Sequence, residues 1–280
     1  MPADCHMHMV LDGVYWKDAI ARHANAPDLG FIRRTLAQYQ VLGFTYLRDG
    51  GDRWGVGAAA RSLAGDYGIT YRTPLSPLCM AGHYGSFIGT AYRDLREYAV
   101  LAARIKRDGG DFIKLMVSGL MDFDRFGVLT EEGLPADTIT ELIHIAKELG
   151  MAVMVHANGA RVIEACAKAG ADSVEHGAYA DADALCAMKE SHTVWVPTLS
   201  TVGNLRGKRR FDEYNVQKIL ALAMQNVSDF AAMGGIVAPG SDAGAWEVMH
   251  PAQSEAALLR EAGVSLCAIE NGILAVKSRF

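Results

Sequence analysis

Short apolar runs recur along the chain, and each ends in glycine or in small polar residues. Runs of this length, bounded by turn signals and rich in branched side chains, are typical of buried β-strands. We therefore predict eight strands, within residues 3–9, 44–51, 69–76, 111–119, 151–159, 173–177, 193–199 and 235–244.

Between these runs the apolar positions follow the spacing of helices. The segment 29–43 places Phe31, Leu36 and Tyr39 near one face, and 137–150 begins at an aspartate and ends at a glycine. An aspartate can cap the start of a helix, and glycine is common just after its end. We expect helices at 29–43, 137–150, 159–170, 214–234 and 251–263.

Alternating strands and helices indicate a parallel sheet, because parallel neighbours need crossover connections. Eight such units in 280 residues suit an α/β fold of the (β/α)8 TIM-barrel type. A doubly wound sheet is the alternative, but the first strand is followed by no glycine-rich phosphate turn, and no GxxxxGK[ST] motif occurs. We predict one barrel domain spanning residues 1–280.

Composition narrows the class of protein. Half of the residues are hydrophobic, and the charged residues, with a net charge of -5, are spread along the chain. No cluster of basic residues indicates binding to nucleic acid or to a membrane surface. The five cysteines are widely spaced without a CxxC pair, which favours reduced thiols. The N-terminal segment lacks the pattern of a signal peptide. We expect a cytoplasmic protein that acts on a small molecule.

Ionisable residues lie within five of the predicted strands or just after their ends. In a barrel the carboxyl ends of the strands meet at one rim, where active sites lie. His6 and His8 are two residues apart, so their rings share one face of the first strand. The residues expected at this rim are His6, His8, Lys114, His156, His176 and Asp242.

Imidazole and carboxylate are preferred ligands of divalent ions such as zinc, and this set suits a site for one metal ion or for two. Lys114 would be repelled by such ions in its charged form. Burial disfavours the ammonium form of a lysine, and a neutral amine can take up carbon dioxide as a carbamate, which is an anion. Lys114 is therefore either a carboxylated ligand that bridges two ions or not part of the site.

The motifs around these residues form a recognisable series. HMH in the first strand, FIKLM in the fourth, VHANG in the fifth, SVEHG in the sixth and GSDAG in the eighth resemble the metal-dependent amidohydrolase superfamily. Within that superfamily, the order of the motifs resembles the binuclear branch with a carboxylated lysine. This branch includes prolidase-like and imidazolonepropionase-like proteins.

The resemblance implies a role for each residue of the set. His6, His8 and Asp242 would hold one metal ion, most simply zinc, and His156 and His176 would hold a second. Carboxylated Lys114 and a water or hydroxide would bridge the two ions. Asp242 would also accept the proton of the water and return it to the leaving group.

Two departures from the family pattern bear on these expectations. Asn158 stands where many relatives of this subgroup have a second histidine, which casts doubt on a substrate-binding role at that position. Family members usually carry a small β-sandwich, for which few residues are present here. We therefore expect a barrel-only form and, because its surface would need cover, a homo-oligomer.

Other polar residues are weaker candidates. In MAGHYGSF (80–87), His83 resembles a substrate-contacting histidine of prolidase-like relatives, and Tyr84 adds a hydroxyl group. Arg48 forms either an internal ion pair or a substrate contact. Arg125 is a candidate for binding a substrate carboxylate, although Asp122 is close enough in sequence to neutralise it. The basic run at 206–210 is read as a solvated surface segment.

We predict a metal-dependent amidohydrolase that cleaves an amide C–N bond, for example in a dipeptide or an N-acyl amino acid. Hydrolysis of an ester, a lactone or a phosphotriester on the same binuclear site is an alternative, as is a catalytically silent metal-binding barrel. A mononuclear deaminase is disfavoured, because such relatives have a catalytic glutamate just after the fifth-strand histidine, where HANG offers none.

Overall fold

The eight apolar runs form the strands of a barrel, which confirms the predicted fold. In the computed structural model, which describes residues 2–280, each run contains one strand. The barrel strands are β1 (Ala3–Met7), β2 (Tyr46–Asp49), β3 (Thr70–Arg72), β6 (Ile113–Met116), β7 (Val153–Ala157), β8 (Ser173–His176), β9 (Val194–Val196) and β10 (Ile236–Val237).

All paired strands of the described chain run parallel. They form a three-stranded sheet in the order β1-β2-β3 and a seven-stranded sheet in the order β10-β9-β8-β7-β6-β4-β5. Several backbone hydrogen bonds join the sheets into a ring, among them Asp242 N to His6 O and His8 N to Ala243 O, each over 2.7 Å. Cys5 N donates to Pro239 O beyond β10, and Asp111 N before β6 donates to Thr73 O beyond β3, each over 2.9 Å.

Two short strands were not predicted. β4 (Leu78–Met80) pairs with β6, and β5 (Thr90–Tyr92) pairs with β4 at the sheet edge. Each has only three residues, and prolines and glycines flank them, so neither is long enough to show a clear alternation. They enclose the loop 81–89, which reaches the rim of the barrel.

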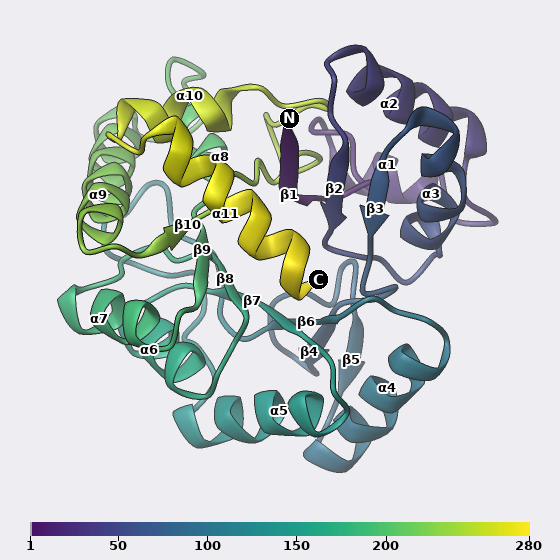
Figure 1. Ribbon diagram of the computed structural model, residues 1–280, viewed down its shortest axis with the longest axis horizontal. Coiled ribbons are helices and arrows are strands. Elements are labelled where there is room, and N and C mark those ends of the chain that lie inside the picture. The colour runs from purple at the N-terminus through teal and green to yellow at the C-terminus, as the bar shows by residue number, and fades with distance from the viewer. Residues whose placement is uncertain (1) are drawn as a thin grey trace.

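Helices surround the strands (Figure 1). All five predicted helices are present with ends that differ by a few residues. The cap expected from Asp137 is absent, because that helix begins at Ala136 after Pro135, whereas Asp28 and Asp212 cap two others through their carboxylates. The helices are α1 (Trp16–Ala21), α2 (Leu29–Val41), α3 (Val56–Ala64), the 3-10 helix η1 (Gly65–Tyr67), α4 (Leu95–Arg107), α5 (Ala136–Glu148), α6 (Ala160–Lys168), α7 (Ala182–Glu190), α8 (Ser200–Gly203), α9 (Glu213–Ala232), α10 (Ser254–Glu261) and α11 (Leu266–Arg279).

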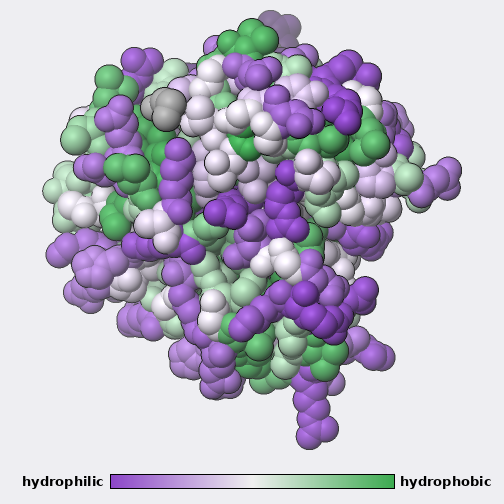
Figure 2. Space-filling view, turned by 45° about the vertical axis from the view of Figure 1, so that its right-hand side comes forward, coloured by the Kyte–Doolittle hydropathy of each residue, from purple (hydrophilic) through white to green (hydrophobic). Residues whose placement is uncertain are grey.

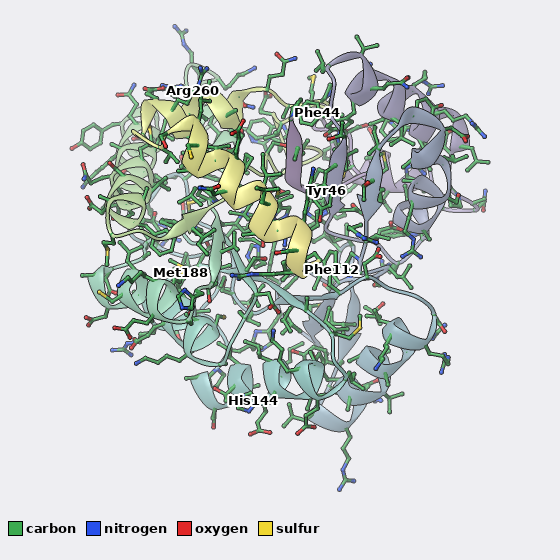
Figure 3. All side chains as sticks on the ribbon, in the orientation of Figure 1. Phe44, Tyr46, Phe112, His144, Met188 and Arg260 are labelled. Carbon is green, nitrogen blue, oxygen red and sulfur yellow. The ribbon has the colours of Figure 1, made fainter. Side chains whose placement is uncertain are left out.

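Helix α11 crosses in front of the strands in the view of Figure 1, and its end lies over the middle of the ring. There Phe280 meets the ring of Phe112, with centroids 5.2 Å apart, and Figure 3 places Phe112 beside that end of the helix. Phe280 also lies 4.3 Å from the guanidinium of Arg48, which is fully buried inside the barrel. This end of the barrel is thus filled, and the opposite end is free for a site.

The surface mixes charged and apolar side chains, and no large area of one kind dominates the face seen in Figure 2. None of the helices within residues 2–280 combines the length and the apolar character needed to cross a membrane.

Candidate metal centre

The six residues expected at the rim line one cavity. It has a volume of about 470 Å³ and lies at the carboxyl ends of the barrel strands. His6 and His8 come from β1 and the residue after it, and Lys114, His156 and His176 come from three neighbouring strands. Asp242 follows β10. The structure therefore brings together all the residues that the sequence assigned to a metal site.

His6, His8 and Asp242 lie closest together. His6 Nε2 is 3.3 Å from His8 Nε2, and Asp242 Oδ1 is 3.5 Å and 3.2 Å from these two nitrogens. Ligand atoms about 2.0 Å from a tetrahedral zinc ion are about 3.3 Å apart. The three atoms are therefore spaced as ligands of one ion.

His156 and His176 form a second pair beside this group. Their ring centroids are 4.5 Å apart, and the ring of His176 lies 5.1 Å from that of His6. His176 Nδ1 is 2.7 Å from the hydroxyl of Thr198, and His156 Nε2 is 3.2 Å from Gly119 O. Each ring thus has one nitrogen occupied by a neighbour and the other left for a ligand.

Burial keeps these histidines neutral. It lowers the pKa of His156 to about 3, and the nearby charge of Lys114 acts in the same direction. It also holds the pKa values of His6 and His176 well below their ordinary range. A metal ion binds the neutral imidazole, so the site already favours the form that acts as a ligand.

Lys114 points into this centre from β6. Its side chain is buried, and Nζ has no hydrogen-bond partner among residues 2–280. Burial lowers the pKa of its ammonium group to about 8. A buried amine without a partner is costly in an apolar protein interior, and a carbamate with two bound cations would satisfy it.

Two of the expected ligands have unusual backbone conformations. His176 has a φ of 66° and Asp242 a φ of 57°, a left-handed region that side chains other than glycine rarely adopt. Neighbouring strand residues normally face opposite sides, yet both Glu175 and His176 reach the inside of the barrel. The turn at His176 makes this possible, and such strain is typical of functional sites.

Glu175 was not among the predicted site residues, although it lies beneath the centre. Its Oε2 is 2.7 Å from His6 Nδ1, and Arg48 donates to both of its oxygens, over 2.9 and 3.1 Å. Arg48 also donates to Cys5 O and to Ser173 Oγ. Arg48 thus forms the internal ion pair weighed from the sequence, with Glu175 as its partner.

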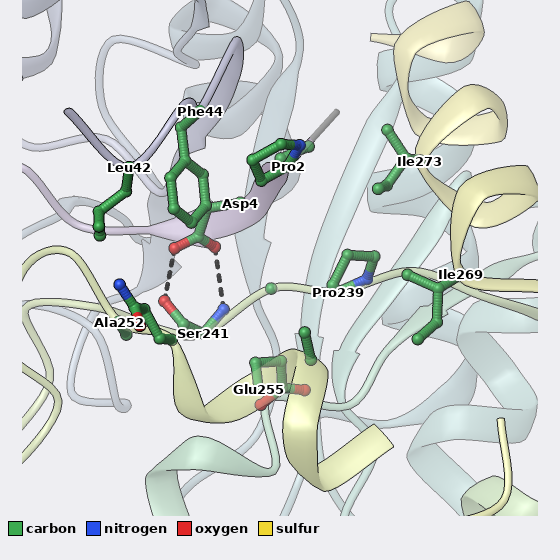
Figure 4. A pocket seen from close by; sticks show the side chains of 14 residues that line it. Pro2, Asp4, Leu42, Phe44, Pro239, Ser241, Ala252, Glu255, Ile269 and Ile273 are labelled. Carbon is green, nitrogen blue, oxygen red and sulfur yellow. Dashed lines mark hydrogen bonds between the residues drawn. The ribbon is translucent and has the colours of Figure 1, made fainter. Parts of the chain in front are cut away.

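Asp4 holds the loop that carries Asp242. Its carboxylate accepts hydrogen bonds from the backbone nitrogen and the hydroxyl of Ser241, as Figure 4 shows. The Ser241 hydroxyl in turn accepts a hydrogen bond from Ala243 N. Both neighbours of Asp242 are therefore fixed to the first strand. Burial raises the pKa of Asp4 to about 6, although these hydrogen bonds oppose the shift.

The two predicted substrate contacts lie in different surroundings. Tyr84 lines the cavity, and its ring centroid is 4.9 Å from that of His156. His83 is not among the described residues that line the cavity, and its ring pairs with the carboxylate of Glu131. Glu131 also accepts a hydrogen bond from Tyr84 N, so this pair fixes the loop that carries Tyr84.

The donor set fits divalent metal ions. Asp242 Oδ1 and Lys114 Nζ are buried polar atoms without a hydrogen-bond partner among residues 2–280, and both face the cavity that the four histidines line. Buried polar groups are otherwise almost always satisfied. The lack of partners is explained if these atoms bind ions, with Lys114 carboxylated.

No family model matches the chain. A curated ochratoxinase from Aspergillus niger is 26% identical over 244 residues, which covers 71% of this chain and 47% of that protein. The chain thus spans about half the length of the curated relative it matches.

Solved structures share the fold over nearly the whole chain. A Xaa-Pro dipeptidase with bound methionine has a TM-score of 0.72 at 22% identity, covering 98% of this chain and 74% of its own. The ochratoxinase of A. niger has a TM-score of 0.74 at 20% identity, covering 99% and 69%. A prolidase in complex with N-methylphosphonate-L-proline has a TM-score of 0.70 at 20% identity, covering 99% and 71%. The chain therefore has the barrel of these prolidase, ochratoxinase and amidohydrolase structures, in agreement with the amidohydrolase resemblance of its motifs.

Proposed function

We propose that the protein is a metal-dependent hydrolase that cleaves an amide C–N bond. The observation that carries the proposal is the cluster of His6, His8 and Asp242, with ligand atoms 3.2 to 3.5 Å apart, in one cavity with His156, His176 and Lys114. The similarity to an ochratoxinase and the barrel shared with prolidases support amide hydrolysis.

The six residues would hold two divalent ions. His6, His8 and Asp242 suit one ion and His156 and His176 the other, with carboxylated Lys114 between them. Two such ions, most simply zinc, would lower the pKa of a bound water towards about 7 and polarise a carbonyl group.

The chain itself supplies proton transfer and orientation. Asp242 presents a carboxylate oxygen to the cavity without a hydrogen-bond partner among the described residues. This oxygen would accept the proton of the attacking water and deliver it to the departing amine nitrogen as the C–N bond breaks. Tyr84 places its ring beside that of His156, and burial raises the pKa of its hydroxyl group, so the hydroxyl stays a hydrogen-bond donor.

The test is hydrolysis by the purified protein of a panel of N-acyl amino acids and dipeptides, alongside lactones and phosphotriesters. The Lys114→Ala variant should lose nearly all amide hydrolysis, because the bridge between the ions is removed. Lys189→Ala, an exposed lysine on α7, is the matched control and should remain active. Unchanged turnover of Lys114→Ala refutes the bridging role. If the protein hydrolyses lactones or phosphotriesters faster than every amide, the proposal that it cleaves an amide C–N bond is refuted.

A further inference from the structure

Asn158 is fully buried in the wall of the metal cavity, directly after β7. Its side-chain nitrogen Nδ2 donates a hydrogen bond of 2.9 Å to Gly119 O, and its oxygen Oδ1 accepts one of 3.0 Å from Ala178 N. Gly119 lies in the segment after β6 and Ala178 in the segment after β8, the two strands that flank β7. One amide group therefore links the ends of three neighbouring strands.

The two neighbours determine the orientation of this amide. A backbone N–H can only donate and a backbone carbonyl can only accept, so Oδ1 faces Ala178 and Nδ2 faces Gly119. The backbone nitrogen of Asn158 is held as well, because it donates to Ser118 Oγ over 2.8 Å, and that hydroxyl lies 3.2 Å from Gly119 O. The side chain thus has one defined position.

The Gly119 carbonyl also determines which nitrogen of His156 can bind an ion. Gly119 O lies 3.2 Å from His156 Nε2. Asn158 Nδ2 is 3.4 Å from the same ring nitrogen, but it is itself a donor and cannot accept a proton. Nε2 therefore carries the ring proton and donates it to Gly119 O, while Nδ1 keeps the lone pair that a metal ion needs.

The other contact of Asn158 holds the turn that carries His176. His176 and Gly177 have φ values of 66° and 65°, and a left-handed conformation at a residue other than glycine persists only where its surroundings enforce it. Asn158 Oδ1 accepts from Ala178 N directly after this turn, and Gly159 N donates to Ala178 O over 2.8 Å. The turn is therefore fixed from the neighbouring strand.

We propose that Asn158 is a positioning residue that holds both histidine ligands of one ion, His156 through Gly119 O and His176 through Ala178 N. The inference rests on the proposed two-ion site, and it gives Asn158 no contact with the ions or with the substrate.

The ion assigned to His6, His8 and Asp242 should not depend on Asn158. Among residues 2–280, the hydrogen bonds of the Asn158 side chain go to Gly119, Ala178 and His156 alone. His6 is held by Glu175 instead. Loss of the amide should therefore weaken one metal site and spare the other.

The experiment replaces Asn158 by leucine, which is similar in size and makes neither contact. Competition between metal-free protein and a chromophoric chelator for zinc should show that Asn158→Leu binds one ion roughly ten- to a hundredfold more weakly and the other as the wild type does. Nitrogen chemical shifts of metal-free protein should report a single Nε2–H tautomer of His156 in the wild type and a mixture in the variant. A general loss of packing does not produce this change.

Asn226→Leu is the matched control. Asn226 Nδ2 donates to Ala180 O in the same segment after β8, and neither residue lines the cavity. This variant should keep both zinc affinities and the single tautomer of His156. Asn158→Ala is measured in parallel, because its smaller side chain removes both contacts without crowding a site in which leucine might not fold.

The outcomes separate this inference from the proposed function. Unchanged affinity for both ions, an equal loss of both, or a single Nε2–H tautomer of His156 in the Asn158 variants overturns the positioning role. If the wild type binds only one ion, the two-ion site is refuted, whereas a change of the His156 tautomer in Asn158→Leu and not in Asn226→Leu still supports the role of Asn158.

Discussion

His6 owes its orientation to a neighbour that lies deeper in the barrel. Glu175 accepts the hydrogen bond of His6 Nδ1 and is itself held by Arg48, which leaves Nε2 facing the cavity. Partners of this kind fix the tautomer and the direction of a metal ligand. Glu175→Gln should weaken metal binding by roughly ten- to a hundredfold, measured by competition with a chromophoric chelator.

Ser173→Ala is the control for this prediction. Its hydroxyl donates to the same carboxylate and does not touch His6 among the described contacts, so metal affinity should change much less. Glu175→Gln also has a signature that a packing defect does not give. Nitrogen chemical shifts of the metal-free protein should report a mixture of His6 tautomers, where the wild type has its proton on Nδ1. A single Nδ1 tautomer and unchanged affinity would rule out this role.

The sequence was most informative at residues that combine a metal-binding side chain with a position at the end of a predicted strand. Histidine, lysine and aspartate at the ends of apolar runs are unusual, so all six rim residues could be identified. Glu175 gave a weaker signal, because strict alternation would have turned either Glu175 or His176 away from the cavity. The left-handed turn at His176 brings both inside, and no residue pattern predicts it. The substrate role of His83 stays a prediction.

At the scale of elements, the turn after β2 lies directly against the first strand. A Cβ at Gly50 would come within 2.1 Å of Cε1 of His8, so the ring can occupy its place only because residue 50 has no side chain. Gly50→Ala should lower the free energy of unfolding by about 1–3 kcal/mol, as overpacking does, and should weaken metal binding by displacing His8. Chemical denaturation and chelator competition measure the two effects.

Gly65→Ala is a suitable comparison. Nothing lies within 4 Å of a Cβ at Gly65, and its φ of -57° is acceptable to alanine. This variant should retain wild-type metal affinity and stability within about 0.5 kcal/mol. If the two variants have the same stability and metal affinity, the close approach of Gly50 to His8 does not matter for either property.

The elements that the sequence did not reveal are the strands β4 and β5 and the helices α1, α3, α4, α7, α8 and α11. β4 and β5 have three residues each and depend on pairing with β6. Helix α11 was missed because its apolar residues are distributed around much of its circumference, where one face meets β10 and β1. Tertiary contacts, rather than local periodicity, determine such elements.

At the scale of the molecule, the buried carboxylate of Glu255 should make stability depend on pH. It accepts hydrogen bonds from Leu199 N and Ser200 N, but burial outweighs them and raises its pKa from the ordinary 4.5 to about 8. The folded protein therefore favours the protonated form. Its contribution to stability is complete below pH 4.5 and is lost as the pH rises through 8.

Glu255→Gln should reduce the fall in stability between pH 5 and 8, measured by denaturant unfolding of metal-free protein. Glu261→Gln, at an exposed position on the same helix, should leave the slope unchanged. An identical slope in wild type and Glu255→Gln would contradict the raised pKa.

The barrel fold could be predicted from the number of strand–helix units, because eight alternating units in a chain of this length are compatible with few other parallel folds. The closure of the ring did not follow from it, since it depends on a few backbone hydrogen bonds between the segments at the ends of the two sheets. The homo-oligomer expected from the sequence stays a prediction, and light scattering of the purified protein tests it.

The central claim is that this rim holds two divalent ions that amide hydrolysis requires. The most direct measurement is amide hydrolysis by chelator-treated protein as zinc is added back. We expect no activity without metal and a rise that ends at two equivalents per chain. Hydrolysis that survives complete removal of metal, or a chain that binds less than one equivalent, would contradict it.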